Sequence, residues 1–424
     1  MEKIIKFFRG LKYRIRQTFV FEPLAFLTRL VVDKRKTKIV GVTGSLGKTT
    51  TTNFIYSVLK TKYPNVYISK DLTTGVPTFL SIFGYSPVRE LRKQFLGLFY
   101  VFFKAFWILL NKRVRFWSHL VLELRCNYAG NNLRFITEKL QPDIRVVTAV
   151  EIVHAENLGG LSEIASKKRA LVECGCLNSH NALLNVDDPY VKDMAKCTVA
   201  KIIFYGFDKS ANARVSDVII NENGLSFVFK EEDNEPINFK VPKIFDRAHV
   251  YAILPAILVG RIYNMNRDEI IDAVSKIEPV EGRGNIVTGI KNSIIINNTF
   301  NANVRSMTAA LKSLAVFPKE RRKIAILGNI LELHKFSDQC HREIGKTISS
   351  DTVDFLITIG DDATKIAEEA VNNGFDINKT LHFNDVDQSI GRIKDMVEEK
   401  DVILVKASHG MNLIKIVNAL KAEK

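Results

Sequence analysis

The sequence predicts an α/β protein with two domains, each built around a mostly parallel sheet. Three observations indicate this class. A glycine-rich loop lies between a strand-like and a helix-like run, strand-like and helix-like segments alternate after it, and the same alternation starts again near residue 293. A chain of 424 residues is long enough for two or three domains with separate cores.

Residues 1–37 are expected to form a basic amphipathic N-terminal segment. Residues 1–36 contain ten lysines and arginines but only three acidic residues, within a chain of net charge +15. Apolar side chains recur at helical spacing between the basic ones, at Ile4, Phe8, Leu11, Ile15 and Phe19. Two interpretations stay open, binding to an anionic membrane surface and packing of the apolar stripe on the main domain. No nucleic-acid-binding motif follows, so nucleic acid is not an expected partner.

The glycine-rich loop has the features of a phosphate-binding loop. Residues 41–50 read Gly-x-Thr-Gly-x-x-Gly-Lys-Thr-Thr, after the strand-like run 38–40 and before the helix-like run 53–59. Glycines let backbone N–H groups and the helix N-terminus face phosphate oxygens, while Lys48 reaches the terminal phosphates and Thr49 holds Mg²⁺. The predicted nucleotide-binding residues are Gly44, Ser45, Gly47, Lys48, Thr49 and Thr50.

The first domain is expected to span residues 38–285 as a P-loop ATPase domain. Its further strands are predicted at 119–124, 144–150, 182–186 and 201–205, and short β-like runs within 213–241 indicate a small antiparallel patch. Helices are predicted at 247–263 and 267–276. The Glu-Gly-Arg-Gly stretch at 281–284 is expected to act as a hinge.

The second domain is expected to span residues 286–424 as a Rossmann-like doubly wound domain. Strands at 294–296, 323–327, 355–359, 380–383 and 402–405 alternate with helices at 303–316, 338–349, 362–373, 386–398 and 412–421. A Gly-x-Gly-x-x-Gly fingerprint is absent from this sequence stretch, so it is not predicted to bind a dinucleotide.

Residues 95–110 are almost wholly apolar and belong to an insert at about 85–117. Lys104 interrupts the run, and Arg89, Arg92, Lys93, Lys112, Arg113 and Arg115 flank it. Sixteen residues fall short of the roughly 20 that span a bilayer, which favours an interfacial or re-entrant segment. A buried core helix and a transmembrane helix remain alternatives.

Cysteine usage and the N-terminus indicate a cytoplasmic protein. Five scattered cysteines are an odd number, which favours a reducing compartment over a disulfide framework. Cys174 and Cys176 form the one close pair and lack a second pair at zinc-ribbon spacing, so ordinary thiols are expected. The N-terminus has no signal-peptide pattern.

Several short blocks, in order, carry a resemblance to a known family. They are Gly-Val-Pro at 75–77, Val-Leu-Glu-Leu at 121–124, Thr-Ala-Val-Glu-Ile-Val-His at 148–154, Asn-Val-Asp-Asp at 185–188, Asn-Thr-Phe-Asn-Ala-Asn at 298–303, Leu-Gly-Asn-Ile-Leu-Glu-Leu at 327–333 and Lys-Ala-Ser at 406–408. With the phosphate loop they resemble the Mur ligases, ATP-dependent amide-forming enzymes of peptidoglycan synthesis. The likeness is strongest to the members that add D-alanyl-D-alanine.

This resemblance implies ATP and Mg²⁺ as cofactors and an acyl phosphate route. The γ-phosphoryl group moves to a carboxylate, and an amine then displaces phosphate, so a cationic clamp is needed. Lys48 matches the clamp, and Thr49, Glu123 and His154 match the Mg²⁺ ligands. Lys168 matches a lysine that the family carbamylates, with Lys167 as an adjacent alternative. Arg283 and Asn301 match nucleotide-contacting positions.

The chain also departs from the family pattern. Phe300 stands where the family has Tyr, Asn297 and Asn298 where it has an acidic residue, and Thr73-Thr74 where it has Asn-Asn. Only 37 residues precede the phosphate loop, which leads us to expect no N-terminal domain for a UDP-sugar. The expected substrates are therefore an acidic peptide or cell-wall precursor, lipid-linked or otherwise, and an amino donor.

The sequence leaves two alternative functions open. One is a ligase of the folylpolyglutamate or poly-γ-glutamate type, and the other is a non-catalytic, membrane-associated relative. The Asn-Ala-Asn block at 301–303 and the Leu-Glu-Leu block at 331–333 argue against the first alternative. Retention of Lys48, Thr49, Glu123, His154 and Lys168 argues against the second. A monomer is expected, peripheral at the inner face of the membrane.

Overall fold

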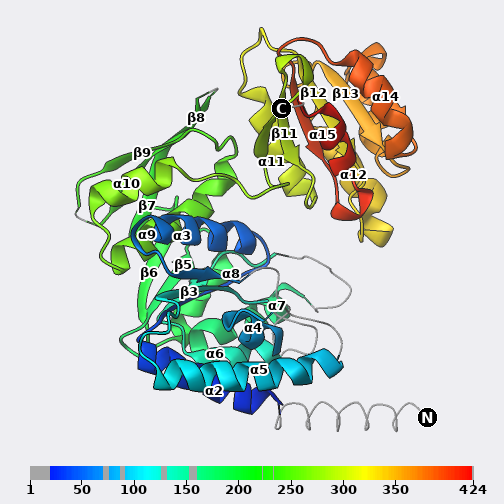
Figure 1. Ribbon diagram of the computed structural model, residues 1–424. Helices are drawn as coiled ribbons and strands as arrows, with labels where there is room; N and C mark the ends of the chain where they lie inside the picture. Colours follow the sequence, from blue (N-terminus) through cyan, green and yellow to red (C-terminus); the bar gives the residue numbers. More distant parts are fainter. Residues whose placement is uncertain are drawn as a thin grey trace. The chain divides into compact units, whose positions relative to one another are not determined.

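The computed structural model describes residues 20–69, 76–85, 91–125, 131–151, 160–221, 223–232 and 234–422 (Figure 1). The chain divides into two compact units. The first comprises Met1–Val215, Lys230–Glu235 and Tyr251–Ala273, and the second comprises Ser216–Phe229, Pro236–Val250 and Val274–Lys424. Each unit has its own core, and the two sheets of the protein are described in turn below.

Among the described residues, nine strands form the first sheet, in the order β2-β3-β1-β4-β5-β6-β7-β8-β9. They are β1 Lys38–Thr43, β2 Val66–Ile68, β3 His119–Glu123, β4 Ile144–Val147, β5 Asn181–Asn185, β6 Lys201–Gly206, β7 Ala213–Asn221, β8 Gly224–Glu231 and β9 Ile237–Val241. In this spatial order, neighbouring strands from β2 through β1 to β6 are parallel, and β8 pairs with β9 antiparallel. The phosphate-loop strand β1 therefore lies between β3 and β4 in a parallel sheet.

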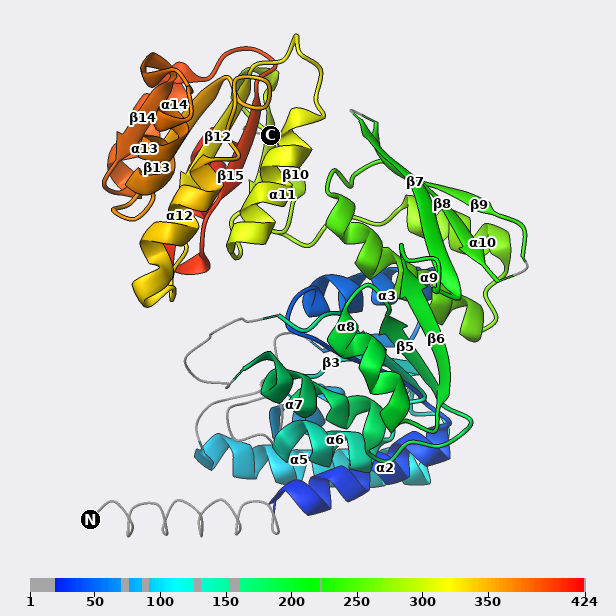
Figure 2. The same cartoon turned by 180° about the vertical axis from the view of Figure 1, so that it is seen from behind.

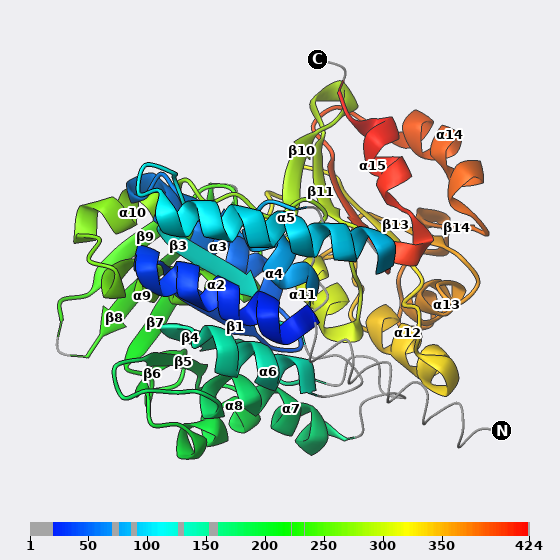
Figure 3. The ribbon, with the colours of Figure 1, turned by 60° about the horizontal axis from the view of Figure 1, so that its bottom comes forward.

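Helices cover both faces of this sheet. They are α2 Glu22–Arg35, α3 Lys48–Lys62, α4 Val76–Ile82, α5 Leu91–Leu110, α6 Asn131–Leu140, α7 Leu161–Glu173, α8 Pro189–Asp193, α9 Val250–Ile262 and α10 Arg267–Ser275, with 3₁₀ turns η2 Met194–Cys197 and η3 Arg247–His249. Helices α2, α5 and α6 run next to one another on one side (Figure 3). Helices α3 and α9 lie on the other side, where Val58 approaches Gly260.

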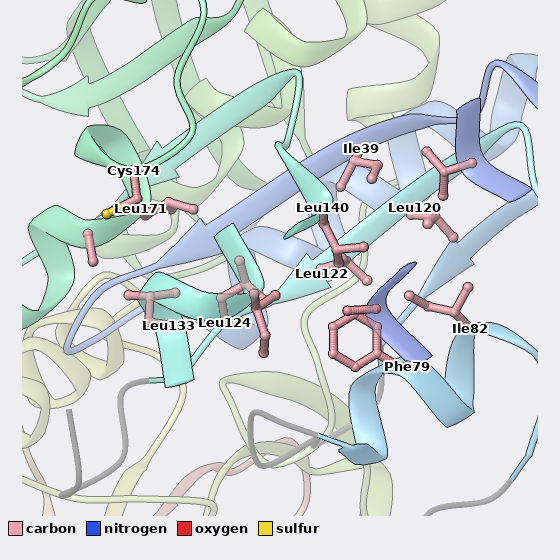
Figure 4. Packing of buried hydrophobic residues seen from close by; sticks show 14 of the residues in the cluster. Ile39, Phe79, Ile82, Leu120, Leu122, Leu124, Leu133, Leu140, Leu171 and Cys174 are labelled. Carbon is pink, nitrogen blue, oxygen red and sulfur yellow. The ribbon is translucent and has the colours of Figure 1, made fainter. Parts of the chain in front are cut away.

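The core of the first unit joins the parallel strands to the helices on the α2 side. Leu120 and Leu122 of β3 pack with Phe79 and Ile82 of α4, and Leu140 of α6 lies in the same cluster (Figure 4). These side chains are almost completely buried. Alternation along a strand puts every second residue on one face, but β3 is buried at every position, and its three central residues are all apolar.

A second sheet of six strands lies in the described part of the second unit, in the order β10-β11-β15-β12-β13-β14. The strands are β10 Asn285–Thr288, β11 Ile294–Asn298, β12 Lys323–Gly328, β13 Phe355–Ile359, β14 Thr380–Phe383 and β15 Val402–Lys406. Strand β10 pairs antiparallel with β11, and the other neighbours are parallel.

The helices of the second unit form one layer on each face of its sheet (Figure 2). They are α11 Val304–Ala315, α12 Ser337–Gly345, α13 Thr364–Asn372, α14 Val386–Met396 and α15 Ile414–Leu420. Helices α11, α12 and α13 contribute to one apolar cluster, and α14 and α15 to another. Two clusters on opposite faces are the mark of a doubly wound domain. The predicted α/β class is thus confirmed.

Helix α5 contains the apolar run at 95–110. Its inner side chains Val101, Ala105 and Ile108 belong to the core of the first unit. Among the described residues, no helix combines the length and apolar character that crossing a bilayer requires. The predicted basic segment lies outside the described residues up to residue 19.

Candidate active site

The phosphate loop connects β1 to α3 at the carboxyl edge of the first sheet. Gly44 and Gly47 both have positive φ, 152° and 78°, and Gly47 is the N-cap of α3. A Cβ atom on Gly44 would lie 1.9 Å from Thr148 Oγ1. Glycine is therefore required at position 44, both for its backbone conformation and for the close approach of the loop to the end of β4.

The residues that follow β4 hold this loop in place. Thr148 Oγ1 donates to Leu46 O at 2.5 Å, and Ser45 N donates to Ala149 O at 2.6 Å. Asn185, at the end of β5, donates from Nδ2 to Thr148 O at 2.8 Å. Strand β4 ends at Val147, not at residue 150 as predicted, because the next residues bond to the loop instead of continuing the ladder.

Lys48 and Thr49 open α3 where a phosphate is expected. Lys48 Nζ donates to Ser45 O at 2.9 Å, so its ammonium lies over the loop. Both side chains are half-buried, while Thr50 is buried. Backbone N–H groups at a helix N-terminus, an ammonium and a hydroxyl form a donor set that fits a nucleotide phosphate and its Mg²⁺. The residues present are thus suited to both cofactors.

Glu123 ends β3 beside the phosphate-loop strand. It lies opposite Val42 in the β1–β3 ladder, and its N–H donates to Ser69 Oγ at 2.7 Å. Its side chain is only 2% exposed and pairs with Arg125, whose Nε lies 2.9 Å from Glu123 Oε1. A buried carboxylate needs such a partner, and a bound cation would serve the same purpose.

Arg125 was not among the residues predicted for the site. A usable signal was present, because residues two apart on an extended chain point to the same face. Arg125 follows Glu123 by two positions at the end of β3, so a cation next to the proposed metal-binding carboxylate was predictable from spacing.

Helix α7 distinguishes the two neighbouring lysines. Lys168 Nζ donates to Gly44 O at 2.7 Å, and the residue is 7% exposed. Lys167 points elsewhere and pairs with Glu163 Oε1 at 2.8 Å. Adjacent helix residues point about 100° apart, so only one of them can face the loop. The lysine at the phosphate loop is Lys168.

A buried arginine fixes the position of α7. Arg145, at the second position of β4, is completely buried and donates to Leu171 O at 2.8 Å, Cys174 O at 2.7 Å and Gly175 O at 2.7 Å. These carbonyls lie at the C-terminal end of α7, where carbonyls lack helical partners. Burial lowers the pKa of Arg145. The contacts tie α7, and with it Lys168, to the central sheet.

The second unit places Arg283 against an aromatic ring. The Arg283 guanidinium lies 4.1 Å from the centre of the Phe300 ring, and that ring is 5.6 Å from His409. Backbone bonds Phe300 N to Gly282 O and Gly284 N to Asn297 O hold the two segments together. Phe300, which replaces the family's Tyr, thus retains the stacking surface but not the hydroxyl.

Lys406, at the end of β15, is a buried lysine that was not among the predicted site residues. Its Nζ donates to Asn301 O at 2.8 Å and Asn298 Oδ1 at 3.3 Å. Burial lowers its pKa to about 7. The side chain of Asn301 is exposed and accepts from Ala302 N, so this predicted nucleotide contact is open to solvent within its unit.

Seven predicted residues therefore meet at one edge of the first sheet, namely Gly44, Ser45, Gly47, Lys48, Thr49, Glu123 and Lys168. Arg283 and Asn301 belong to the second unit. His154 lies outside the described residues. Within the described ranges, no group of three or more His, Cys, Asp or Glu side chains is placed to hold a metal, and Cys174 and Cys176 therefore belong to no such group.

Fold and site together define a P-loop ATPase domain joined to a doubly wound domain. Family models agree with this class: the Mur ligase middle domain matches residues 108–260, and the Mur ligase glutamate ligase domain matches residues 282–409. The two matches cover about two thirds of the sequence. The chain belongs to the Mur ligase family, and it is an ATP-dependent, ADP-forming ligase that joins a carboxylate to an amine.

Two curated relatives share the same name. The UDP-N-acetylmuramoyl-tripeptide–D-alanyl-D-alanine ligase of Bacillus subtilis is 25% identical over 395 residues, which are 93% of this chain and 78% of that protein. The Escherichia coli enzyme of the same name is 22% identical over 405 residues, 95% of this chain and 80% of that protein.

Solved structures share the fold. MurF ligase from Thermotoga maritima in complex with ADP has a TM-score of 0.70 and 22% identity, covering 94% of this chain and 83% of that one. MurF from Acinetobacter baumannii has a TM-score of 0.73 and 18% identity, covering 92% and 79%. Escherichia coli FolC with ADP has a TM-score of 0.62 and 17% identity, covering 94% of both chains.

Proposed function

We propose that this ligase extends a cell-wall precursor by forming an amide between an acidic peptide and an amino donor. The observation that carries the proposal is the convergence of Lys48, Lys168 and Glu123 on one phosphate loop. Each carries charge, and each lies where a phosphoryl group is transferred in an enzyme of this class. The relatives named above, whose names specify a muramoyl-tripeptide and D-alanyl-D-alanine, support this substrate class.

Lys48 is the proposed cationic clamp on the transferring phosphoryl group. Thr49 and Glu123, with His154, are the proposed ligands of Mg²⁺, which when bound would neutralise charge on the phosphates. Arg125 is a proposed positioning residue, because its ion pair with the Glu123 carboxylate compensates that buried charge. Removing Arg125 should leave the carboxylate without that compensation.

Lys168 is the proposed site of carbamylation. A carbamate on Nζ converts a cation into an anion, which would stand beside the loop where it supports a metal. The side chain is buried against Gly44 and comes from a helix that Arg145 anchors, so its position is well defined. Arg283 and Asn301 are the proposed nucleotide contacts of the second unit.

The proposed partners and location follow from the substrate class. An acidic peptide precursor and an amino donor are made in the cytoplasm, and a lipid-linked acceptor would place the enzyme at the inner face of the membrane, as a monomer. A glutamate-adding ligase remains the second candidate, because the structural match to FolC extends over 94% of each of the two chains.

A substrate panel tests the proposal. Purified full-length protein receives MgATP with a UDP-muramoyl-tripeptide or its lipid-linked form, each with D-alanyl-D-alanine, or a folate with glutamate. ADP release is followed together with the mass of the product. The proposal predicts ADP release that needs both acid and amine, with a muramoyl peptide as the acid.

Lys48→Ala is the control within this experiment. Loss of one strong transition-state contact costs a thousandfold or more in rate, so the variant should be inactive with its fold intact. Activity only with folate and glutamate would establish the second candidate instead. ATP binding without turnover on any acid would favour a non-catalytic relative.

A further inference from the structure

Helix α5 exposes a continuous apolar surface, called here the outer face of α5. It consists of Leu96, Phe99, Tyr100, Phe102, Phe103, Phe106, Trp107 and Leu110, whose side chains are between 42% and 67% exposed. From residue 96 to 110, every exposed side chain of the helix is apolar or aromatic. An outer face of this kind is unusual, because a surface helix normally turns charged residues to water.

The sequence of α5 explains why both faces are apolar. Val101, Ala105 and Ile108 follow helical spacing and are buried in the core, and Leu98 and Leu109 are half-buried against it. The other large apolar and aromatic side chains from residue 96 to 110 are exposed. The one charged residue of the run, Lys104, is half-buried and donates to Phe83 O at 2.7 Å and Tyr100 Oη at 3.0 Å. The charge is thus turned back toward the protein, and the outer face keeps none.

Exposed cations gather at the C-terminal end of α5. Arg35, at the end of α2, donates to Ile108 O at 2.6 Å and Asn111 O at 2.7 Å, which brings the ends of α2 and α5 together. The exposed cations of these two ends are Lys34, Lys36, Lys112, Arg113 and Arg115. The acidic residue next to them, Asp33, is paired with Arg29 at 2.8 Å.

Helix α2 also exposes apolar side chains. It runs beside α5 (Figure 3) and exposes Phe26 and Leu30, one helical turn apart. Phe, Trp and Tyr side chains bordered by lysines and arginines are the composition of helices that lie in the lipid–water interface. A surface that binds a protein normally has a polar rim whose groups form hydrogen bonds to the partner. The outer face of α5 has hydrogen-bonding side chains only at Tyr100 and Trp107.

We propose that the outer face of α5 inserts into the interface of an anionic lipid bilayer, with the helix parallel to the membrane plane and the five cations against lipid phosphates. This surface lies on the helix layer of the first unit and contains none of the residues proposed for the ligase reaction. It gives a physical basis to the proposed membrane location, and it stands or falls separately from the catalytic assignment.

Vesicle flotation tests the docking surface. Full-length protein is mixed with vesicles of phosphatidylcholine alone or vesicles rich in phosphatidylglycerol, at low and high salt. Binding is expected to the anionic vesicles and to weaken with salt. Phe103→Ser combined with Phe106→Ser should reduce the affinity by about tenfold or more, because two of the largest inserted side chains are lost.

A matched pair of substitutions serves as the control. Val199 and Ile377 are 62% and 68% exposed but lie outside α5 and α2. Val199→Ser combined with Ile377→Ser removes similar exposed apolar surface and should leave vesicle binding unchanged. Circular dichroism and the ligase assay on both double variants establish that the folds are intact.

Trp107 reports the insertion directly. The chain has two tryptophans, and the other, Trp117, is half-buried and donates to Ile82 O at 2.7 Å. In a Trp117→Phe background, anionic vesicles should shift Trp107 emission to shorter wavelength, and brominated lipids should quench it. Unchanged emission at saturating anionic lipid would overturn the proposal.

Two other results would also overturn it. One is self-association in lipid-free buffer that the Phe103→Ser, Phe106→Ser variant abolishes, because the outer face would then be an interface between two copies. The other is vesicle binding that survives this double substitution but disappears on deletion of residues 1–19, which would assign the membrane contact to the basic N-terminal segment instead.

Discussion

Two adjacent lysines on α7 have different surroundings. Lys168 reaches the carbonyl of Gly44, whereas Lys167 pairs with Glu163 on the same helix. The resemblance assigned the family position to Lys168, but it left Lys167 as an adjacent alternative. The separation comes from the rotation of α7, which the buried contacts of Arg145 set.

We predict that Lys168→Ala loses about a thousandfold in rate and partly recovers with a short carboxylic acid, since an anion is what the site then lacks. Lys167→Ala should be nearly silent. Protein equilibrated with ¹³C-bicarbonate should give a carbamate carbon resonance that the Lys168→Ala variant lacks. A fully active, metal-loaded enzyme without that resonance would show that Lys168 acts as a plain amine.

Lys406 should make stability depend on pH. Burial lowers its pKa in the folded state to about 7, while its ordinary value is 10.5. Between these values the unfolded chain binds more protons, so the free energy of unfolding rises with pH and is lowest below about 7. Relative to Lys406→Met, the wild type should gain about 1 kcal/mol or more across this window.

Urea unfolding of both proteins at several pH values measures this difference. The Met variant leaves Asn298 Oδ1 and Asn301 O without the ammonium, but that cost does not vary with pH. A free-energy difference that stays constant from neutral to alkaline pH would mean that Lys406 keeps its charge in the folded protein.

At the scale of elements, most strands were predictable because fully buried parallel strands are short apolar runs bounded by polar residues. Strands β13 and β14 match the predicted bounds, and β3 ends one residue earlier. The antiparallel edge strand β10 was missed, because Asn285–Thr288 is short and only half apolar. Helix α5 stayed ambiguous because its apolar residues surround the whole helix, which hides the period that separates inside from outside.

The candidate site was predictable where a motif is contiguous in the chain and less so where it depends on packing. The loop glycines, Lys48 and Thr49 follow from spacing alone. Two other features depend on which strand ends lie side by side. One is the set of hydrogen bonds from Thr148 and Asn185 that holds the loop, and the other is the ion pair between Arg125 and Glu123. That order, β3-β1-β4-β5, is a property of the sheet and not of any segment.

The connection between β1 and α3 gives a prediction at this scale. Gly44→Ala would place a methyl group 1.9 Å from Thr148 Oγ1 at a φ of 152°. We expect about 3 kcal/mol of destabilisation or more and loss of nucleotide binding, measured by thermal unfolding and by binding of a fluorescent ATP analogue. The matched change Gly391→Ala lies in α14 with open space around it and should be neutral or slightly stabilising. Equal midpoints for the two variants would contradict the packing described.

At the scale of the whole molecule, two features combine. A parallel sheet with a charged phosphate loop defines the ligase class, and α5 presents an aromatic surface beside exposed cations in a chain of net charge +15. The chain spans about four fifths of the curated relatives' length. The two features predict an enzyme that activates a carboxylate while bound at an anionic surface.

The route through an acyl phosphate is the central claim, and oxygen transfer tests it most directly. The acid that supports turnover is labelled with ¹⁸O in its carboxylate, and the released phosphate is analysed by mass spectrometry. Because the carboxylate oxygen attacks the γ-phosphoryl group and leaves with it when the amine attacks, each amide formed should yield one ¹⁸O-labelled phosphate and one ADP. Unlabelled phosphate, or AMP in place of ADP, would contradict the account.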